Sequence, residues 1–253
     1  MFIDTHAHLT MPEYTDLNEV LTRARDAKIT AIVNASFDLK SSKESLKLAQ
    51  EHDFIYAAVG IHPHDADKVD ENAIAALREM AKDKKVVAIG ETGLDYHYHK
   101  DIKDLQIEAF RKFLKLAQEL NKPVIVHCRE AQEDTINTMK EENRGGLRGV
   151  FHCFAGDDNL IDFAKEIGFY ISFTGNVTFK KADKVRENVS KVPLEMMLLE
   201  TDCPYLAPEP NRGKRNEPSY IPIIARAIAD IKGISIEELA AATTKNAGKL
   251  FLI

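Results

Sequence analysis

The segment FIDTHAHL, residues 2–9, places polar, metal-capable side chains at every second position directly after an apolar start. In a β-strand successive side chains point to opposite faces, so Asp4, His6 and His8 share one face while the residues between them point the other way. Three such side chains converge on one small volume. The pattern predicts a strand from Ile3 to His8 whose polar face belongs to a functional site.

Seven more short apolar runs follow this strand, and amphipathic stretches with helical spacing separate most of them. The predicted strands are Ile3 to His8, Ile29 to Asn34, Ile55 to Val59, Val86 to Glu91, Val124 to His127, Gly149 to His152, Phe169 to Phe173 and Met196 to Asp202. The predicted helices are Leu17 to Ala27, Ser42 to Glu51, Asn72 to Lys82, Lys103 to Leu120, Leu160 to Ile167 and Ile221 to Lys232, then one starting at Ser235 and a short one from Asn246.

Strand and helix alternating over roughly 250 residues is typical of an α/β fold, the (β/α)₈ TIM barrel. A doubly wound open sheet is the main alternative, but no GxGxxG segment follows the first strand. With 253 residues, 44% of them hydrophobic, and no linker-like stretch, the chain predicts a single domain over residues 1–253.

Composition narrows the cellular context that we expect. The N-terminus has no signal-peptide pattern, and no apolar run reaches about 18 residues, so we expect no membrane partner. The three cysteines Cys128, Cys153 and Cys203 lack CxxC spacing, which favours a reducing compartment, the cytoplasm by default. The net charge of −6 does not favour binding of a polyanion, so any such ligand must be attracted by local cations. No coiled-coil heptad or other sign of a protein partner occurs, so a monomer is the default.

Metal-capable side chains fall at the carboxyl ends of the predicted strands, where barrel enzymes form their active sites. These residues are His6, His8, Glu91, His127, His152 and Asp202. Four imidazoles and two carboxylates exceed the needs of one four-coordinate site with an open position, but they suit two adjacent cations that share a carboxylate. We therefore predict two divalent cations per subunit. Imidazole ligands favour zinc, manganese or iron, whereas magnesium prefers oxygen.

Nearly the whole chain resembles the TatD family of metal-dependent deoxyribonucleases, within the amidohydrolase-like barrels. The segments that carry the resemblance are DTHAHL at 4–9, VGIHPH at 59–64, AIGETGLDY at 88–96, KPVIVHCREA at 122–131, GVFHCFAG at 149–156, LLETDCPYLAPEPNRGKRNEPSY at 198–220 and TTKNAGKLF at 243–251. It implies a TIM-barrel hydrolase that cleaves phosphodiester bonds of DNA, exonucleolytically, with a two-metal-activated water. The family is commonly described as magnesium-dependent, so the metal identity stays open.

The resemblance also implies a division of the ligands between the two cations. His6, His8, Glu91 and Asp202 surround one cation, while Glu91, His127 and His152 hold the other, so Glu91 bridges them. We interpret Asp202 as the group that orients the nucleophilic water and accepts its proton. Asp4 is expected to support a ligand imidazole through a hydrogen bond.

Substrate contacts are expected from polar residues in loops on the same face: His62, His64, Arg129, Arg212 and Arg215. The expected partner is DNA or an oligonucleotide, whose phosphates such residues and the cations would attract. One alternative function is a barrel amidohydrolase that cleaves a small amide or ester, because the same activated water would serve. Another is a non-enzymatic, metal-dependent nucleic-acid binding protein.

Overall fold

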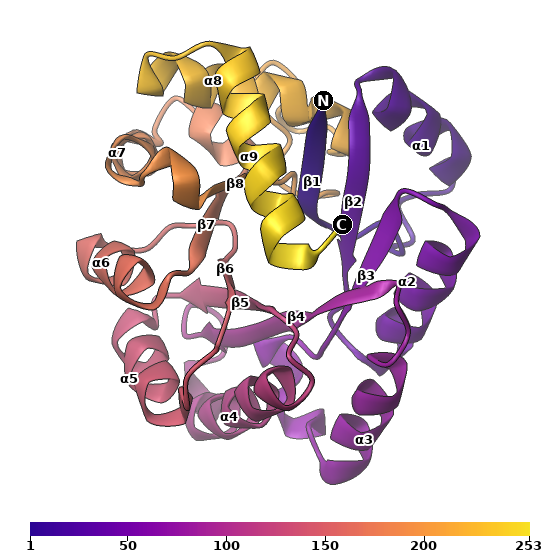
Figure 1. The fold of residues 1–253 in the computed structure, drawn as a ribbon, viewed down its shortest axis with the longest axis vertical. Coiled ribbons are helices and arrows are strands. Elements are labelled where there is room, and N and C mark those ends of the chain that lie inside the picture. Colours follow the sequence, from indigo (N-terminus) through magenta and orange to yellow (C-terminus); the bar gives the residue numbers. More distant parts are fainter. The chain divides into compact units, whose positions relative to one another are not determined.

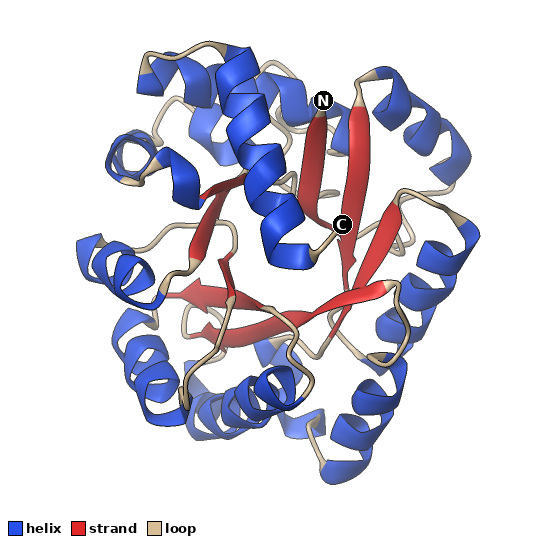
Figure 2. Cartoon of the chain, in the orientation of Figure 1, coloured by secondary structure: helices blue, strands red, loops and turns tan.

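The computed structural model describes residues 1–253, and its elements follow the strand–helix alternation expected from the sequence (Figures 1 and 2). The strands are β1 Phe2–Ala7, β2 Ile29–Ala35, β3 Ile55–Val59, β4 Val86–Asp95, β5 Val124–Arg129, β6 Gly149–Phe151, β7 Tyr170–Phe173 and β8 Met197–Leu199. The helices are α1 Leu17–Asp26, α2 Leu39–Glu51, α3 Glu71–Met80, α4 Lys103–Glu119, α5 Gln132–Glu142, α6 Asp158–Ile167, α7 Asp183–Lys191, α8 Ile221–Lys232 and α9 Ile236–Phe251.

The eight strands form one sheet whose order follows the chain from β1 to β8. The strand pairs are parallel, for example Ile3 with Ala31 between β1 and β2, which lie side by side in Figure 1. A parallel bridge between Ala7 and Cys203 joins the end of β1 to the segment after β8. Sequential parallel order with the first and last strands adjacent is the topology of a (β/α)₈ barrel, so the predicted fold class is confirmed.

The chain divides into two compact, discontinuous units, which are described separately. Unit 1 comprises Met1–Asn34, Cys153–Ala155 and Tyr170–Ile253, and unit 2 comprises Ala35–His152 and Gly156–Phe169. Because each unit is assembled from segments far apart in the sequence, neither corresponds to a continuous stretch of chain. The single domain over residues 1–253 stays a prediction.

In unit 1, the C-terminal helix α9 packs against β1 and β8. Its start is fixed by Ser235, whose side chain accepts a hydrogen bond from the Glu238 N–H at 3.1 Å. Asn246 donates to the carbonyls of Leu194 and Met197, each at 2.9 Å, where β8 begins. The helix therefore packs at the amino ends of these strands, away from the polar residues at their carboxyl ends.

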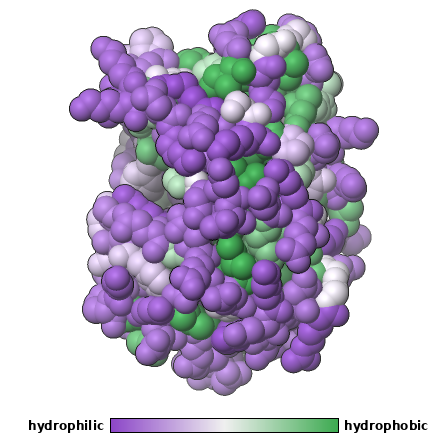
Figure 3. All heavy atoms as spheres, turned by 90° about the vertical axis from the view of Figure 1, so that its left-hand side faces the viewer, coloured by the Kyte–Doolittle hydropathy of each residue, from purple (hydrophilic) through white to green (hydrophobic).

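Three helices of the structure, α5, α7 and α9, differ from the predicted ones. The separate short helix from Asn246 is wrong, because α9 runs without a break from Ile236 to Phe251. The expected alternation implied helices here, but no residue ranges were predicted for α5 and α7, since they bury few aliphatic side chains: α7 buries only Asn188 and Val189. Figure 3 shows a mostly hydrophilic face with apolar atoms in scattered patches. This is expected for surface helices, which turn their polar side chains toward solvent.

In unit 2, β4 extends four residues beyond the predicted end at Glu91, to Asp95. Gly93 lies in this extension with φ at +138°, and a Cβ there would lie 2.0 Å from the His127 carbonyl oxygen. Glycine at this position thus lets β4 and β5 approach closely. The longer strand carries a further buried carboxylate, Asp95, toward the histidine of β5.

Candidate metal centre

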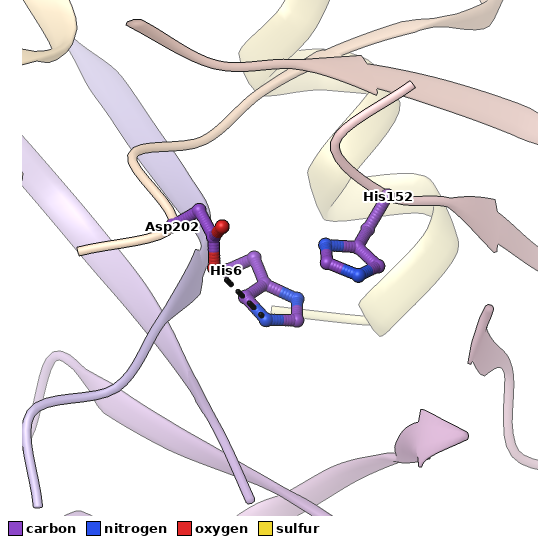
Figure 4. A group of neighbouring side chains, drawn as sticks. All are labelled: His6, His152 and Asp202. Carbon is purple, nitrogen blue, oxygen red and sulfur yellow. Dashed lines mark ion pairs between the residues drawn. The ribbon is translucent and has the colours of Figure 1, made fainter. Parts of the chain in front are cut away.

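In unit 1, His6 of β1 and His8, which directly follows the strand, bring their ring nitrogens together. His6 Nε2 and His8 Nε2 are 3.1 Å apart, and both side chains are buried. Asp202 follows β8, and its Oδ1 lies 3.4 Å from His8 Nε2 and 3.8 Å from His6 Nε2. The dashed line in Figure 4 marks the contact between His6 and Asp202. The Asp202 N–H donates to the His6 carbonyl at 2.9 Å, which fixes this residue beside the end of β1.

Asp4 shares the strand but contacts no imidazole. Its carboxylate accepts hydrogen bonds from Thr201 N–H at 3.0 Å, from Thr201 Oγ1 at 2.6 Å and from the His6 N–H at 3.3 Å. Burial raises the pKa of this carboxyl to about 7, against the opposing effect of the Thr201 hydrogen bonds. The expected hydrogen bond to a ligand ring is therefore wrong: Asp4 accepts from Thr201 and from the His6 N–H, and so joins β1 to the segment that carries Asp202.

In unit 2, three imidazoles surround one carboxylate oxygen of Glu91. His152 Nε2 lies 2.7 Å from Glu91 Oε1, His127 Nδ1 lies 2.9 Å from it and His62 Nε2 lies 3.5 Å from it. His127 Nδ1 is also 3.2 Å from His152 Nε2. Glu91 is 3% exposed, so the carboxylate on which the rings converge is shielded from solvent. His152, also labelled in Figure 4, thus joins the group around Glu91.

The donor chemistry of both groups fits a divalent cation. Neutral imidazole nitrogens repel one another through their lone pairs unless a proton or a cation lies between them. Imidazole and carboxylate together are the ligand set of zinc, manganese and iron sites in proteins. His62, Glu91 and His127 alone place three ligand atoms within 4.8 Å of one another. Each unit therefore holds side chains that could contribute to a metal site.

Asp95 supports the second group and was not singled out from the sequence. Its Oδ2 lies 3.1 Å from His127 Nε2 and 3.0 Å from His64 Nε2. Its Oδ1 accepts from the N–H groups of His97 and Tyr98 at 2.9 and 3.1 Å. A carboxylate on the far nitrogen of a ligand imidazole fixes the orientation of that ring. The even spacing from Glu91 was the signal that could have found it, had the strand been extended.

The pKa values of two of the histidines beside Glu91, His62 and His127, are shifted in opposite directions. Burial lowers the pKa of His62 to about 4, against the opposing effect of Glu91, so its imidazole is neutral near pH 7. Burial also lowers the pKa of His127, but its contacts with Asp95 and Glu91 outweigh this, and the pKa is raised. For Asp95, burial raises the pKa, yet its contacts with His127 and His64 bring it well below its usual range.

The expected substrate contacts lie in different surroundings. His62 and His64 follow β3, with ring centroids 4.2 Å apart, and His64 is held by Asp95. The Arg129 guanidinium lies 4.8 Å from the centroid of the exposed Tyr98 ring.

The two arginines of the loop after β8 also differ from each other. Arg212 lies 4.4 Å from the centroid of the Phe179 ring and is exposed. Arg215 forms an ion pair with Asp16 at 2.6 Å and lies 4.8 Å from the centroid of the Tyr14 ring. Arg215 therefore has an internal partner, whereas Arg212 has only a ring.

Comparison with known proteins places this chemistry in a family. The family described as TatD related DNase matches residues 3–252. The chain is 47% identical over 254 residues to the "Uncharacterized metal-dependent hydrolase YabD" of Bacillus subtilis (strain 168), covering 100% of both chains. It is 35% identical over 255 residues to the "3'-5' ssDNA/RNA exonuclease TatD" of Erwinia amylovora, covering 98% of each.

A solved structure with a similar fold is that of YJJV, a TatD homologue from Escherichia coli K12. It matches with a TM-score of 0.93 and 29% identity, covering 100% of this chain and 98% of the other. No helix of the present chain has the length and apolar character needed to cross a membrane.

Proposed function

The chain belongs to the family of TatD-related DNases, whose named members include metal-dependent hydrolases, and from this premise we propose that it hydrolyses phosphodiester bonds of DNA or oligonucleotides, removing nucleotides from a strand end. The observation that carries the proposal is the convergence of His62, His127 and His152 on one buried oxygen of Glu91. The name of the Erwinia amylovora relative, a 3'-5' ssDNA/RNA exonuclease, supports the choice of substrate.

We assign two divalent cations to this function. His6, His8, Glu91 and Asp202 would hold one, and Glu91, His127 and His152 the other, with Glu91 shared. When bound, two such cations lower the pKa of a water and neutralise charge on the attacking and leaving oxygens of a phosphoryl displacement. Magnesium, manganese and zinc are the candidates.

The chain's own residues carry the proton and position the phosphate. Asp202, whose side chain is 14% exposed, orients the nucleophilic water and accepts its proton at a carboxylate oxygen. His62 is neutral near pH 7 and its Nδ1 accepts from the His64 N–H, so its Nε2 carries the ring proton and is the atom that donates to a phosphate oxygen without adding a charge. Asp95 holds the His127 ring in one orientation, which keeps the geometry fixed between turnovers.

The test offers the purified, metal-loaded protein a panel of substrates. Single- and double-stranded DNA and RNA, labelled at the 3′ or the 5′ end, are incubated beside p-nitrophenyl esters and N-acyl amino acids, with magnesium, manganese or zinc. We expect shortening from one end of the labelled strands, abolished by a chelator. If the amides or esters are hydrolysed while the nucleic acids stay uncleaved, the proposal is overturned in favour of a barrel amidohydrolase. Binding of nucleic acid without hydrolysis of any substrate would favour a non-enzymatic binding protein.

A further inference from the structure

A cavity in unit 1 lies between the segment that follows β7 and the loop that follows β8. Its volume is about 420 Å³, and its lining consists of Phe179, Lys180, Lys181, Ala182 and Arg212. None of these residues is a candidate metal ligand. Three cations, one aromatic ring and one methyl group therefore share a single hollow, in a chain whose net charge is −6.

The backbone that forms the cavity is held in place by hydrogen bonds. Arg186, from α7, donates to the carbonyls of Val177, Phe179 and Lys180 at 3.3, 2.7 and 3.2 Å. The N–H of Glu209 donates to Thr178 Oγ1 at 2.9 Å, which joins the two loops. A hollow lined by fixed backbone can bind a ligand with little ordering cost.

The cations of the cavity have no carboxylate partner within the protein. Lys180, Lys181 and Arg212 are exposed and form no ion pair, whereas the nearby Lys184 and Arg186 pair with Glu187 and Asp183. Arg212 instead lies over the Phe179 ring, 4.4 Å from its centroid. Unpaired cations beside an aromatic face suit a ligand that has both a flat apolar ring and a negative charge.

The position of the cavity relates it to Asp202. Strands β7 and β8 are parallel, and both lining segments follow their carboxyl ends. Asp202 lies at the start of the same loop that carries Arg212, ten residues earlier in the chain. The cavity and Asp202 thus both belong to the segments that follow the carboxyl ends of β7 and β8.

We propose that this cavity is a subsite for one nucleotide of a single-stranded nucleic acid, away from the bond that is cut. The inference rests on the proposed function. The base packs against Phe179 and Arg212, while Lys180 and Lys181 bind the adjoining phosphates. Base stacking on an aromatic ring with cations along the backbone is a recurring way to bind single strands without reading their sequence.

The test measures binding of a fluorescein-labelled phosphorothioate dT₁₂, which resists hydrolysis, to the metal-loaded protein by fluorescence anisotropy. The variant Lys180→Ala/Lys181→Ala removes two exposed charges, and Phe179→Leu keeps an apolar side chain without an aromatic face. Each is expected to weaken binding about tenfold. The double variant should also lower the slope of log Kd against log salt by about 0.7 for each phosphate that the protein no longer neutralises.

The matched control is Lys43→Ala/Lys47→Ala on α2, where two exposed lysines outside the cavity are removed with the same change in net charge. An equal loss of binding in the control would overturn the proposal. Unchanged affinity and salt slope in Lys180→Ala/Lys181→Ala, the cavity variant, would also overturn it. Complete displacement of dT₁₂ from the cavity by micromolar thymidine monophosphate would also overturn it, because the site would then belong to a free nucleotide.

The outcomes separate this proposal from the proposed function. If the wild-type protein hydrolyses oligonucleotides while the cavity variant binds dT₁₂ as tightly as wild type, the subsite is refuted and the nuclease activity stands. If the wild-type protein hydrolyses none of them but the cavity variant loses affinity and salt slope, the subsite stands and the nuclease activity is refuted.

Discussion

His127 Nε2 lies 3.1 Å from Asp95 Oδ2, on the side of the ring opposite the nitrogen that faces Glu91. The ring is therefore held between two carboxylates, one of which is a candidate metal ligand. Because Asp95 is 1% exposed, its effect on the ring is little weakened by solvent. The contact between Asp95 and His127 therefore connects the last residues of β4 to a candidate metal ligand.

Asp95→Asn is expected to weaken metal affinity by about 10–100-fold, since the carboxylate orients His127 and raises its basicity. Competition against a metal-chelating dye measures this change. Asp65→Asn is the control, because Asp65 forms an ion pair with Lys68 on the surface and the variant has the same change in charge. Wild-type metal affinity in Asp95→Asn would contradict the role assigned to Asp95.

Glu91→Ala is expected to abolish both metal occupancy and turnover, because it removes the carboxylate that we propose both cations share. Elemental analysis after dialysis gives the number of cations per chain, and Glu130→Ala at an exposed position is the control. Two cations in Glu91→Ala would rule out the bridging role. One remaining cation would assign Glu91 to a single site.

The sequence predicted the candidate ligands but not the residue behind them. His6, His8, Glu91, His127, His152 and Asp202 were singled out because polar residues after apolar strands are conspicuous. Asp95 was missed because Gly90-Glu91-Thr92-Gly93 has the composition of a strand end. In the structure β4 continues through Gly93, where the close approach of β5 leaves no room for a Cβ.

Strand and helix boundaries show the same limit. The helix α5 buries Thr135, Thr138 and Met139 rather than a stripe of aliphatic residues, so its sequence has weak apolar periodicity. Strand β8 ends at Leu199, and Asp202 lies beyond it with φ at +54°. The position of Asp202 thus depends on contacts with β1 and not on strand alternation, which sequence spacing does not reveal.

Asp202→Asn is expected to lower kcat by about 10²–10⁴-fold, because the amide cannot accept the proton of the nucleophilic water. Steady-state kinetics on a labelled oligonucleotide, with the metal content measured in parallel, tests this. Asp230→Asn, an exposed residue of α8, is the control. Unchanged kcat with full metal content would remove Asp202 from the proton transfer.

The stability of chelated, metal-free protein is expected to depend on pH through Asp95 and His127. The lowered pKa of Asp95 gives stability that is present above its unfolded value of about 3.9 and lost as pH falls toward the folded value. The raised pKa of His127 gives stability that is present below about 6.5 and lost as pH rises through the folded value.

Both contributions are therefore complete only between about pH 4 and 6.5. Urea unfolding from pH 3 to 9 measures the effect as the difference between the wild-type protein and Asp95→Asn. The difference in the free energy of unfolding should be largest in this interval and shrink on either side. A difference that does not vary with pH would contradict the pairing of these two groups.

Arg212 and Arg215 lie three residues apart, and we expect their removal to have different effects. Arg215 donates to the Glu13 carbonyl at 2.7 Å and to the Asp16 carboxylate at 2.6 and 2.9 Å, which joins the loop after β8 to the segment before α1. Its loss in Arg215→Ala should cost about 1 kcal/mol, because the pair is partly exposed. For a chain of this length, the midpoint of thermal unfolding should fall by about 2–4 °C.

Arg212→Ala is the matched control, since Arg212 has no carboxylate partner and contacts the ring of Phe179. This variant should change the midpoint less than Arg215→Ala does, while weakening the binding of an oligonucleotide more. Differential scanning calorimetry and fluorescence anisotropy on the two variants measure both quantities. If Arg215→Ala kept the wild-type midpoint and lost oligonucleotide affinity, Arg215 would be a substrate contact, and its ion pair with Asp16 would not be what holds the loop.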